Sequence, residues 1–187
     1  DSTSDTAVSV KLIGVDTDYV EVEEVVALTG TTPVTTTNSF LRVNDLLTIS
    51  GNAVGDVTVT GTVSTGTTVA KMIAGTGRNQ ASIYTVPAGC SFYLTRINAF
   101  SSEATGAPSS KVGAFKNFVR LSSGVELRVA ETDYEARMEI IRIAPFKYSE
   151  KTDIQLQSKT FSTHSTSIFA EGILIKDNEF NVWSDGY

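Results

Sequence analysis

Few residues of this chain could act as a nucleophile or a general base. His164 is the only histidine and Cys90 the only cysteine. A Ser-His-Asp triad needs a histidine between an acid and an activated serine, and the Gly-x-Ser-x-Gly turn of many hydrolases does not occur. No histidine lies near Cys90 in the sequence, so we interpret Cys90 as a buried small hydrophobic residue that forms no disulfide and can be replaced. We expect His164 in an exposed loop, no catalytic residue, and a protein that is not an enzyme.

Two groups of acidic residues could supply oxygen ligands to a cation. Asp16 and Asp18 form one group, and Glu131, Asp133 and Glu135 the other. Neither group matches the spacing of a calcium-binding loop, and alternating acids are typical of solvated strand edges. A structural cation remains an alternative because oxygen-ligand sites need no motif. The sequence assigns no metal ligand and no cofactor-binding residue, although carboxylate pairs that cleave glycosides are recognised only by their separation in space.

The composition argues against two classes of partner. The chain has 187 residues and a formal net charge of −6, and a nucleic-acid surface would need a cationic footprint. No apolar run approaches the roughly 20 residues that cross a bilayer, and no leader segment is recognisable. A single cysteine and the absence of Asn-x-Ser/Thr sequons suit a protein assembled inside a cell. We expect neither nucleic acid nor a membrane as a partner.

The elements that position these residues are predicted to be strands. Apolar and polar residues alternate, and Gly/Thr-rich turns interrupt the pattern at intervals too short for helices. Strands are predicted over residues 7–13, 18–28, 39–50, 55–63, 67–73, 81–87, 90–100, 112–121, 125–131, 137–143, 153–160 and 165–176. Only residues 131–138 could form a helical turn, with an exposed loop as the alternative. In the second strand Val20, Val22, Val26 and Leu28 share a face that Glu24 interrupts.

These strands predict one all-β domain over residues 1–187. We expect an antiparallel β-sandwich of the jelly-roll type, with an extended N-terminal arm at residues 1–6 and a C-terminal tail at residues 177–187.

Several phrases, in this order, resemble a family of small virion structural proteins of tailed bacteriophages, common among marine and cyanobacterial phages. They are residues 20–28 leading into Thr31-Thr32-Pro33-Val34, residues 39–43, residues 83–89 leading into residues 92–96, residues 150–154 and residues 169–174. Such proteins often have a lysine after the Pro-Ala-Gly turn, where this chain has Cys90. The resemblance implies a β-sandwich that decorates or cements the head, or that sits in the tail or neck. It implies no role for any single residue.

The leading hypothesis is a capsid decoration or cement protein that stabilises the major-capsid shell. We expect a homotrimer on the outer surface of the virion head, assembled in the host cytoplasm, with the major capsid protein as partner. The contact surface is expected at the N-terminal arm, the Thr/Gly loops and the tail around Trp183. The alternative is a tail, neck or fibre module that binds a host-surface glycan through Trp183, Tyr148 or Tyr187.

Overall fold

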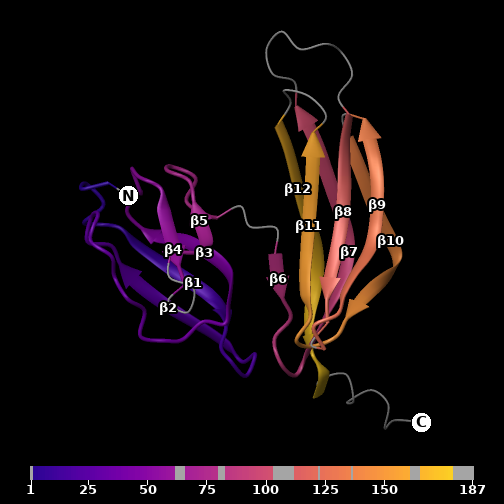
Figure 1. Cartoon of the computed structure of the whole chain (residues 1–187), viewed down its shortest axis with the longest axis horizontal. Helices are drawn as coiled ribbons and strands as arrows, with labels where there is room; N and C mark the ends of the chain where they lie inside the picture. The colour runs from indigo at the N-terminus through magenta and orange to yellow at the C-terminus, as the bar shows by residue number, and fades with distance from the viewer. Residues whose placement is uncertain are drawn as a thin grey trace. The chain divides into compact units, whose positions relative to one another are not determined.

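The computed structural model describes residues 2–61, 66–79, 83–102, 112–121, 123–135, 137–160 and 165–178. Strands account for 60% of the chain and helix for 2%, which confirms the all-β prediction. Within the described ranges there are twelve strands, and every pairing between them is antiparallel (Figure 1). They are β1 (Ser9–Val15), β2 (Glu21–Ala27), β3 (Arg42–Ser50), β4 (Val57–Thr60), β5 (Thr68–Met72), β6 (Ile83–Thr85), β7 (Cys90–Ser102), β8 (Val112–Arg120), β9 (Glu126–Glu135), β10 (Arg137–Tyr148), β11 (Asp153–Thr160) and β12 (Ser165–Lys176).

The chain divides into two compact units, which differs from the single domain expected over residues 1–187. Unit 1 is Asp1–Ala81 and unit 2 is Ser82–Tyr187. Each unit has its own cluster of buried apolar side chains, and no residue belongs to both clusters. The strand pattern could not reveal the boundary, because alternation shows which face of a strand is buried but not in which core.

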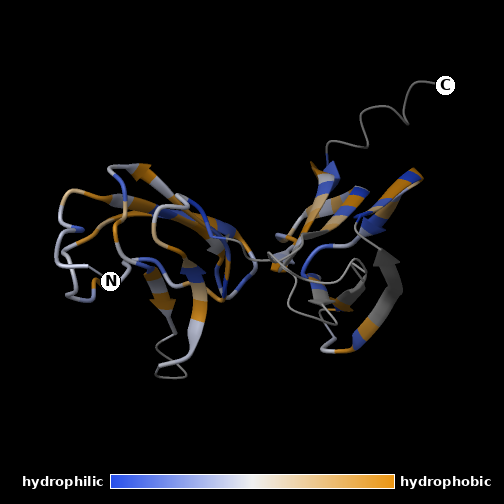
Figure 2. Cartoon of the chain, turned by 90° about the horizontal axis from the view of Figure 1, so that it is seen from above, coloured by the Kyte–Doolittle hydropathy of each residue, from blue (hydrophilic) through white to orange (hydrophobic). Residues whose placement is uncertain are grey.

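Unit 1 consists of a three-stranded sheet, in the order β2-β1-β3, and the hairpin β4-β5. Strand β3 packs against β5, which brings the hairpin over the sheet. Apolar and polar residues alternate along the strands, visible as alternating orange and blue in Figure 2. The core consists of Val8, Val10, Leu12, Val26, Leu46, Ala53, Val57, Ala70 and Met72.

The first residues of unit 1 form a turn and not the extended arm expected at residues 1–6. The Asp5 backbone N–H donates to Ser2, and the Asp5 carbonyl accepts from Gly30. The Asp5 side chain is 1% exposed, and its carboxylate accepts the backbone N–H groups of Val54 and Gly55. The polar segment around Asp5 packs against unit 1 because its one buried carboxylate satisfies two backbone donors of the loop at residues 54–55.

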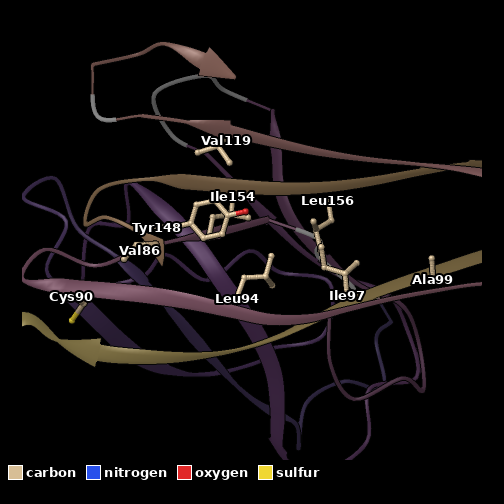
Figure 3. Close-up of a cluster of buried hydrophobic side chains, with 9 residues drawn as sticks. All are labelled: Val86, Cys90, Leu94, Ile97, Ala99, Val119, Tyr148, Ile154 and Leu156. Carbon is tan, nitrogen blue, oxygen red and sulfur yellow. The ribbon is translucent and has the colours of Figure 1, made fainter. Parts of the chain in front are cut away.

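Unit 2 is a sandwich of two sheets with the orders β10-β7-β12 and β6-β11-β8-β9. Strand β12 faces β11, β7 faces β8, and β10 faces β9. Leu94 and Ile97 of β7 point toward Ile154 and Leu156 of β11 in the core between the sheets (Figure 3). A jelly roll has eight strands, whereas the described part of unit 2 has seven.

A bulge at Thr95 divides the central strand β7 into two halves. Leu94 and Arg96 have partners in both β10 and β12, and Thr95 has none in either. Before the bulge Leu94 faces the core, and after it Ile97 and Ala99 do. One extra residue therefore exchanges the two faces of the strand. The Thr95 hydroxyl donates to the Glu171 carbonyl at 3.0 Å.

In the one candidate for a helical turn, residues 131–138, the described residues 131–135 lie in β9 and 137–138 in β10 instead. Strand β9 pairs with β8 from Val112↔Glu135 to Arg120↔Glu126, and β10 begins its pairing with β7 at Arg137↔Phe100. Ladder hydrogen bonds over two long strand pairs outweigh the weak helical spacing of a short charged segment.

Candidate interaction surface

The residues singled out for possible chemistry are not brought together in the described structure. Cys90 is buried at the start of β7 and belongs to the unit 2 core, as expected for a small hydrophobic residue. His164 lies outside the described residues. Among the described residues no group of three or more His, Cys, Asp or Glu side chains could hold a metal ion.

The two acidic groups have separate structural settings. The Asp16 carboxylate accepts the backbone N–H groups of Asp18 and Val20, both at 2.9 Å, and so closes the turn between β1 and β2. Glu131, Asp133 and Glu135 lie in β9, and their side chains are outside the described part. A carboxylate that closes a turn explains the Asp16 and Asp18 spacing without a cation.

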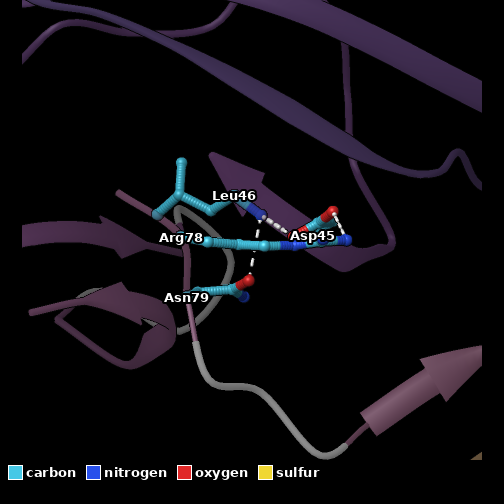
Figure 4. Close-up of polar contacts among 4 residues, drawn as sticks. All are labelled: Asp45, Leu46, Arg78 and Asn79. Atoms are coloured by element: carbon cyan, nitrogen blue, oxygen red, sulfur yellow. Dashed lines mark hydrogen bonds and ion pairs between the residues drawn. The ribbon is translucent and has the colours of Figure 1, made fainter. Parts of the chain in front are cut away.

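A bidentate ion pair in unit 1 joins β3 to the segment that leaves β5 (Figure 4). Arg78 donates to both carboxylate oxygens of Asp45, through Nε at 3.0 Å and Nη2 at 2.6 Å. The side-chain hydrogen bond to Asp45 raises the pKa of the Arg78 guanidinium. Beside it the Leu46 N–H donates to the side-chain oxygen of Asn79 at 3.2 Å. These contacts fix a chain segment and leave no acid or base poised to react.

Three carboxylates of unit 1 have lowered pKa values, and each has a structural cause. Backbone N–H donors lower the pKa of Asp5, Val54 most strongly, and those of Asn38 and Thr37 lower the pKa of Glu24. The hydrogen bond from Lys71, followed by that from the Ala74 N–H, lowers the pKa of Asp56. Glu24, which interrupts the apolar face of β2, thus holds the loop at residues 37–38. Ionised groups that hold loops are structural, and a general base would need its pKa raised toward neutrality.

The sheet β10-β7-β12 has one face toward the core of unit 2 and one face away from it. We call the second the outer face, and the exposed side chains on it are not explained by the packing of the core. Residues opposite each other in neighbouring strands share a face. Three rows follow from the register: Arg137, Phe100 and Ser167; Glu139, Asn98 and Phe169; Ile141, Arg96 and Glu171. Ile173, opposite Tyr93, continues the same face beyond the bulge.

An aromatic pair and a charge cluster lie side by side on the outer face. The rings of Phe100 and Phe169 stack with centroids 5.8 Å apart, and the Arg137 guanidinium lies 5.5 Å from the Phe100 centroid. Phe100 is 36% exposed and Phe169 45% exposed. Next to them Arg96 contacts Glu139 at 3.7 Å and Glu171 at 3.6 Å. Apolar area beside balanced charge is typical of a protein-binding surface.

The edge strand β10 carries a second exposed apolar group. Ile141 pairs with Arg96 and Phe146 with Leu94, so residues 142–145 bulge out where β7 has only Thr95. Ile143, within this bulge, is fully exposed, and Ile141 and Phe146 on either side are also exposed. Sequence patterning missed the bulge because Ile140, Ile141 and Ile143 show no regular alternation that would locate it. Pro145, which cannot donate to a ladder, was the available signal.

The aromatic residues expected to form a glycan platform do not form one in the described structure. Tyr148 is 3% exposed, and its ring packs against Phe146 and Phe92 with centroid distances of 4.9 Å and 6.4 Å. Trp183 and Tyr187 lie outside the described residues. The exposed aromatic pair of the sheet β10-β7-β12 is Phe100 and Phe169. Sequence reasoning missed the pair because the two rings adjoin only through the register of two strands that lie about 60 residues apart in the chain.

No known protein family, no curated protein and no solved structure matches this chain. Within the described ranges no helix is long and apolar enough to cross a bilayer. We therefore infer the function from the exposed surface of unit 2.

Proposed function

We propose that this chain is a non-enzymatic structural protein of a virion, a decoration or cement protein that binds the outer surface of the head and stabilises the major-capsid shell as an oligomer. The observation that carries the proposal is the concentration of exposed apolar side chains on one sheet of unit 2. They are Phe100, Ile141, Phe169 and Ile173 on the outer face, and Ile143 in the bulge of β10. The sequence resemblance to phage virion proteins supplies the kind of partner.

The chemistry of this surface suits binding and not catalysis. Isolated exposed apolar residues are ordinary, but a group of them on one sheet marks an interaction site. Ile143 extends from an edge bulge, where a partner can contact it without disturbing the core. The acidic net charge of −6 is compatible with a shell that surrounds nucleic acid.

A cement protein acts through mass action. A partner that binds only the assembled shell stabilises it by RT ln(1 + [L]/Kd), which is about 2.7 kcal/mol per site at a hundredfold excess over Kd. Repeated over many sites, this free energy resists the pressure of the packaged genome.

The proposal predicts that particles stripped of this chain release their genome at a lower temperature than complete particles. Adding back the wild-type protein should restore retention, whereas Ile143→Asp should not, because it places a charge at the centre of an apolar contact. Genome release on heating, followed by a nucleic-acid dye, measures the effect.

The matched control is Val125→Asp, since Val125 is exposed in the turn between β8 and β9, away from the sheet β10-β7-β12. It should restore retention as the wild type does. Unchanged genome retention in stripped particles would exclude the cement function.

One observation favours a second function, the binding of a host-surface glycan by a tail, neck or fibre module. The Phe100 and Phe169 rings are exposed and surrounded by Arg137, Glu139 and Ser167, so apolar and hydrogen-bonding groups adjoin. Glycan binding by the isolated protein that is lost in Phe169→Ala would favour this function over the shell.

A further inference from the structure

Strand β12 has one long edge with which no described strand pairs. It forms one border of the sheet β10-β7-β12, and in the described part of the chain no strand pairs with its other side. It is twelve residues long, which is about 40 Å, and it contains no proline. A row of backbone N–H and C=O groups on such an edge is a template for another strand.

The other three edges of unit 2 are protected by known devices. Strand β6 has only three residues, and β10 is interrupted by the bulge at residues 142–145, which contains Pro145. Strand β9 is rich in charge, with Glu126, Arg128, Glu131, Asp133 and Glu135. Short length, bulges, proline and charge are the means by which proteins prevent pairing at sheet edges. Strand β12 has only Glu171 and Lys176 as charged residues, so its edge lacks the protection that the other three edges have.

The opposite sheet indicates that the position beyond β12 suits a strand. Strands β12, β7 and β10 face β11, β8 and β9, and β6, which lies beyond β11, contacts the opposite sheet through Tyr84, whose ring centroid is 5.3 Å from that of Phe92 in β7. A strand added beside β12 would lie over β6. Leu174 shares the inward face of β12 with Ile168 and is still exposed, so a strand at this position would have an apolar side chain to cover.

We propose that β12 pairs with β12 of a second copy of this chain, antiparallel and about a two-fold axis. The two sheets then form one continuous sheet in the order β10-β7-β12-β12-β7-β10. This inference does not depend on a virion function, since it rests on the edge and not on the shell.

The sequence of β12 is self-complementary in such a pair. Phe169, Glu171 and Ile173 point outward, so residues of the same face must oppose each other across the axis. With Glu171 on the axis, Phe169 lies opposite Ile173 of the second copy, and both are apolar and exposed. The two Glu171 carboxylates then adjoin, and Arg96, 3.6 Å from Glu171 in each copy, offsets their repulsion.

The interface has two sources of free energy. Backbone hydrogen bonds along the strand satisfy groups that no described strand pairs with, and Phe169, Ile173 and Leu174 bury apolar area on both faces of the joined sheet. A stable interface buries about 800 Å² on each partner, so the side chains must contribute beside the backbone. A two-fold pair gives a dimer, whereas the sequence-based expectation was a trimer.

The test is the mass of the full chain in solution by sedimentation, over a range of concentrations. The wild type should be a dimer, and Ile173→Lys should raise the dimer dissociation constant by more than about tenfold, because the ammonium would adjoin an apolar ring. Ile141→Lys is the matched control. Ile141 is 64% exposed and Ile173 57% exposed, and both lie on the outer face of an edge strand. The control should remain a dimer.

A second measurement detects the pairing directly. In a Cys90→Ser chain, Glu171→Cys places one thiol on the axis, opposite its own copy, at a separation that a disulfide can span. Mild oxidation should give a covalent dimer, and Ile141→Cys should give none. A monomer at all concentrations, a trimer, a dimer that Ile173→Lys leaves intact, or the absence of the Glu171→Cys dimer would each overturn the inference.

Discussion

Gly172 occupies a place in β12 where a side chain does not fit. A Cβ at this position would lie 2.3 Å from the Phe92 ring and 2.6 Å from the Tyr93 carbonyl oxygen. Gly172→Ala should therefore destabilise unit 2 by about 1–3 kcal/mol, the usual cost of overpacking. Urea unfolding measures this free energy.

The control for Gly172 is Gly61→Ala, where the nearest side-chain atom to a new Cβ, from Val69, is at an ordinary 3.6 Å. Gly61→Ala should change the free energy of unfolding by much less than Gly172→Ala does. Equal effects of the two substitutions would show that the close approach of the Phe92 ring does not set the cost.

At the residue scale, the sequence predicted whether a side chain is buried or exposed better than it predicted which residues that side chain contacts. The burial of Cys90 and the interruption of an apolar face by Glu24 were predictable from residue type and alternation. The bonds of Glu24 to the loop at residues 37–38, and of Asp5 to the loop at residues 54–55, depend on tertiary structure that alternation does not encode.

At the scale of elements, three turns or loops of unit 1 are held by ionised carboxylates, those of Asp5, Glu24 and Asp56. Their pKa values are lowered from 3.8, 4.5 and 3.8 in the folded protein. A carboxyl group with a lowered folded pKa stabilises the protein above its unfolded pKa, and this contribution is lost as pH falls through the folded pKa. We predict that unit 1 loses stability progressively below about pH 4.5, the upper end of those ordinary values.

Thermal unfolding followed by calorimetry between pH 7 and pH 3 tests this prediction. The transition of unit 1 should move to lower temperature on acidification, and Asp5→Asn should reduce the part of that shift due to Asp5. A transition temperature that is independent of pH down to pH 3 would contradict it.

All twelve predicted strands occur, because alternation and Gly/Thr turns are local signals. Their ends differ by a few residues, most clearly at β9, which continues to Glu135 and not to residue 131, and at β10, which continues to Tyr148. The extension of β10 follows from its pairing with β7 on both sides of the bulge. Pairing partners are non-local, so they could not be predicted, and of the two bulges only that of β10 had a local signal, Pro145.

At the scale of the whole molecule, the two separate cores predict that damage to one unit leaves the other intact. Leu46 is fully buried in the core of unit 1, and Leu94 is almost as deeply buried in that of unit 2. Leu46→Ala and Leu94→Ala should each lower the free energy of unfolding of its own unit by about 2–5 kcal/mol. Calorimetry should show two transitions, each moved by one substitution only. A single transition that both substitutions move equally would mean that the units unfold together.

The bulge at Thr95 also constrains how the length of this chain can vary among related proteins. Deleting one residue there would turn Ile97 and Ala99 outward and Phe100 inward, unless the whole strand slid along both of its neighbours. An insertion or deletion within residues 142–145, already looped out of an edge strand, would leave every other pairing in place. Alignment gaps among homologues of this chain should therefore gather at the bulge of β10 and be absent from that of β7, although the two bulges lie opposite each other.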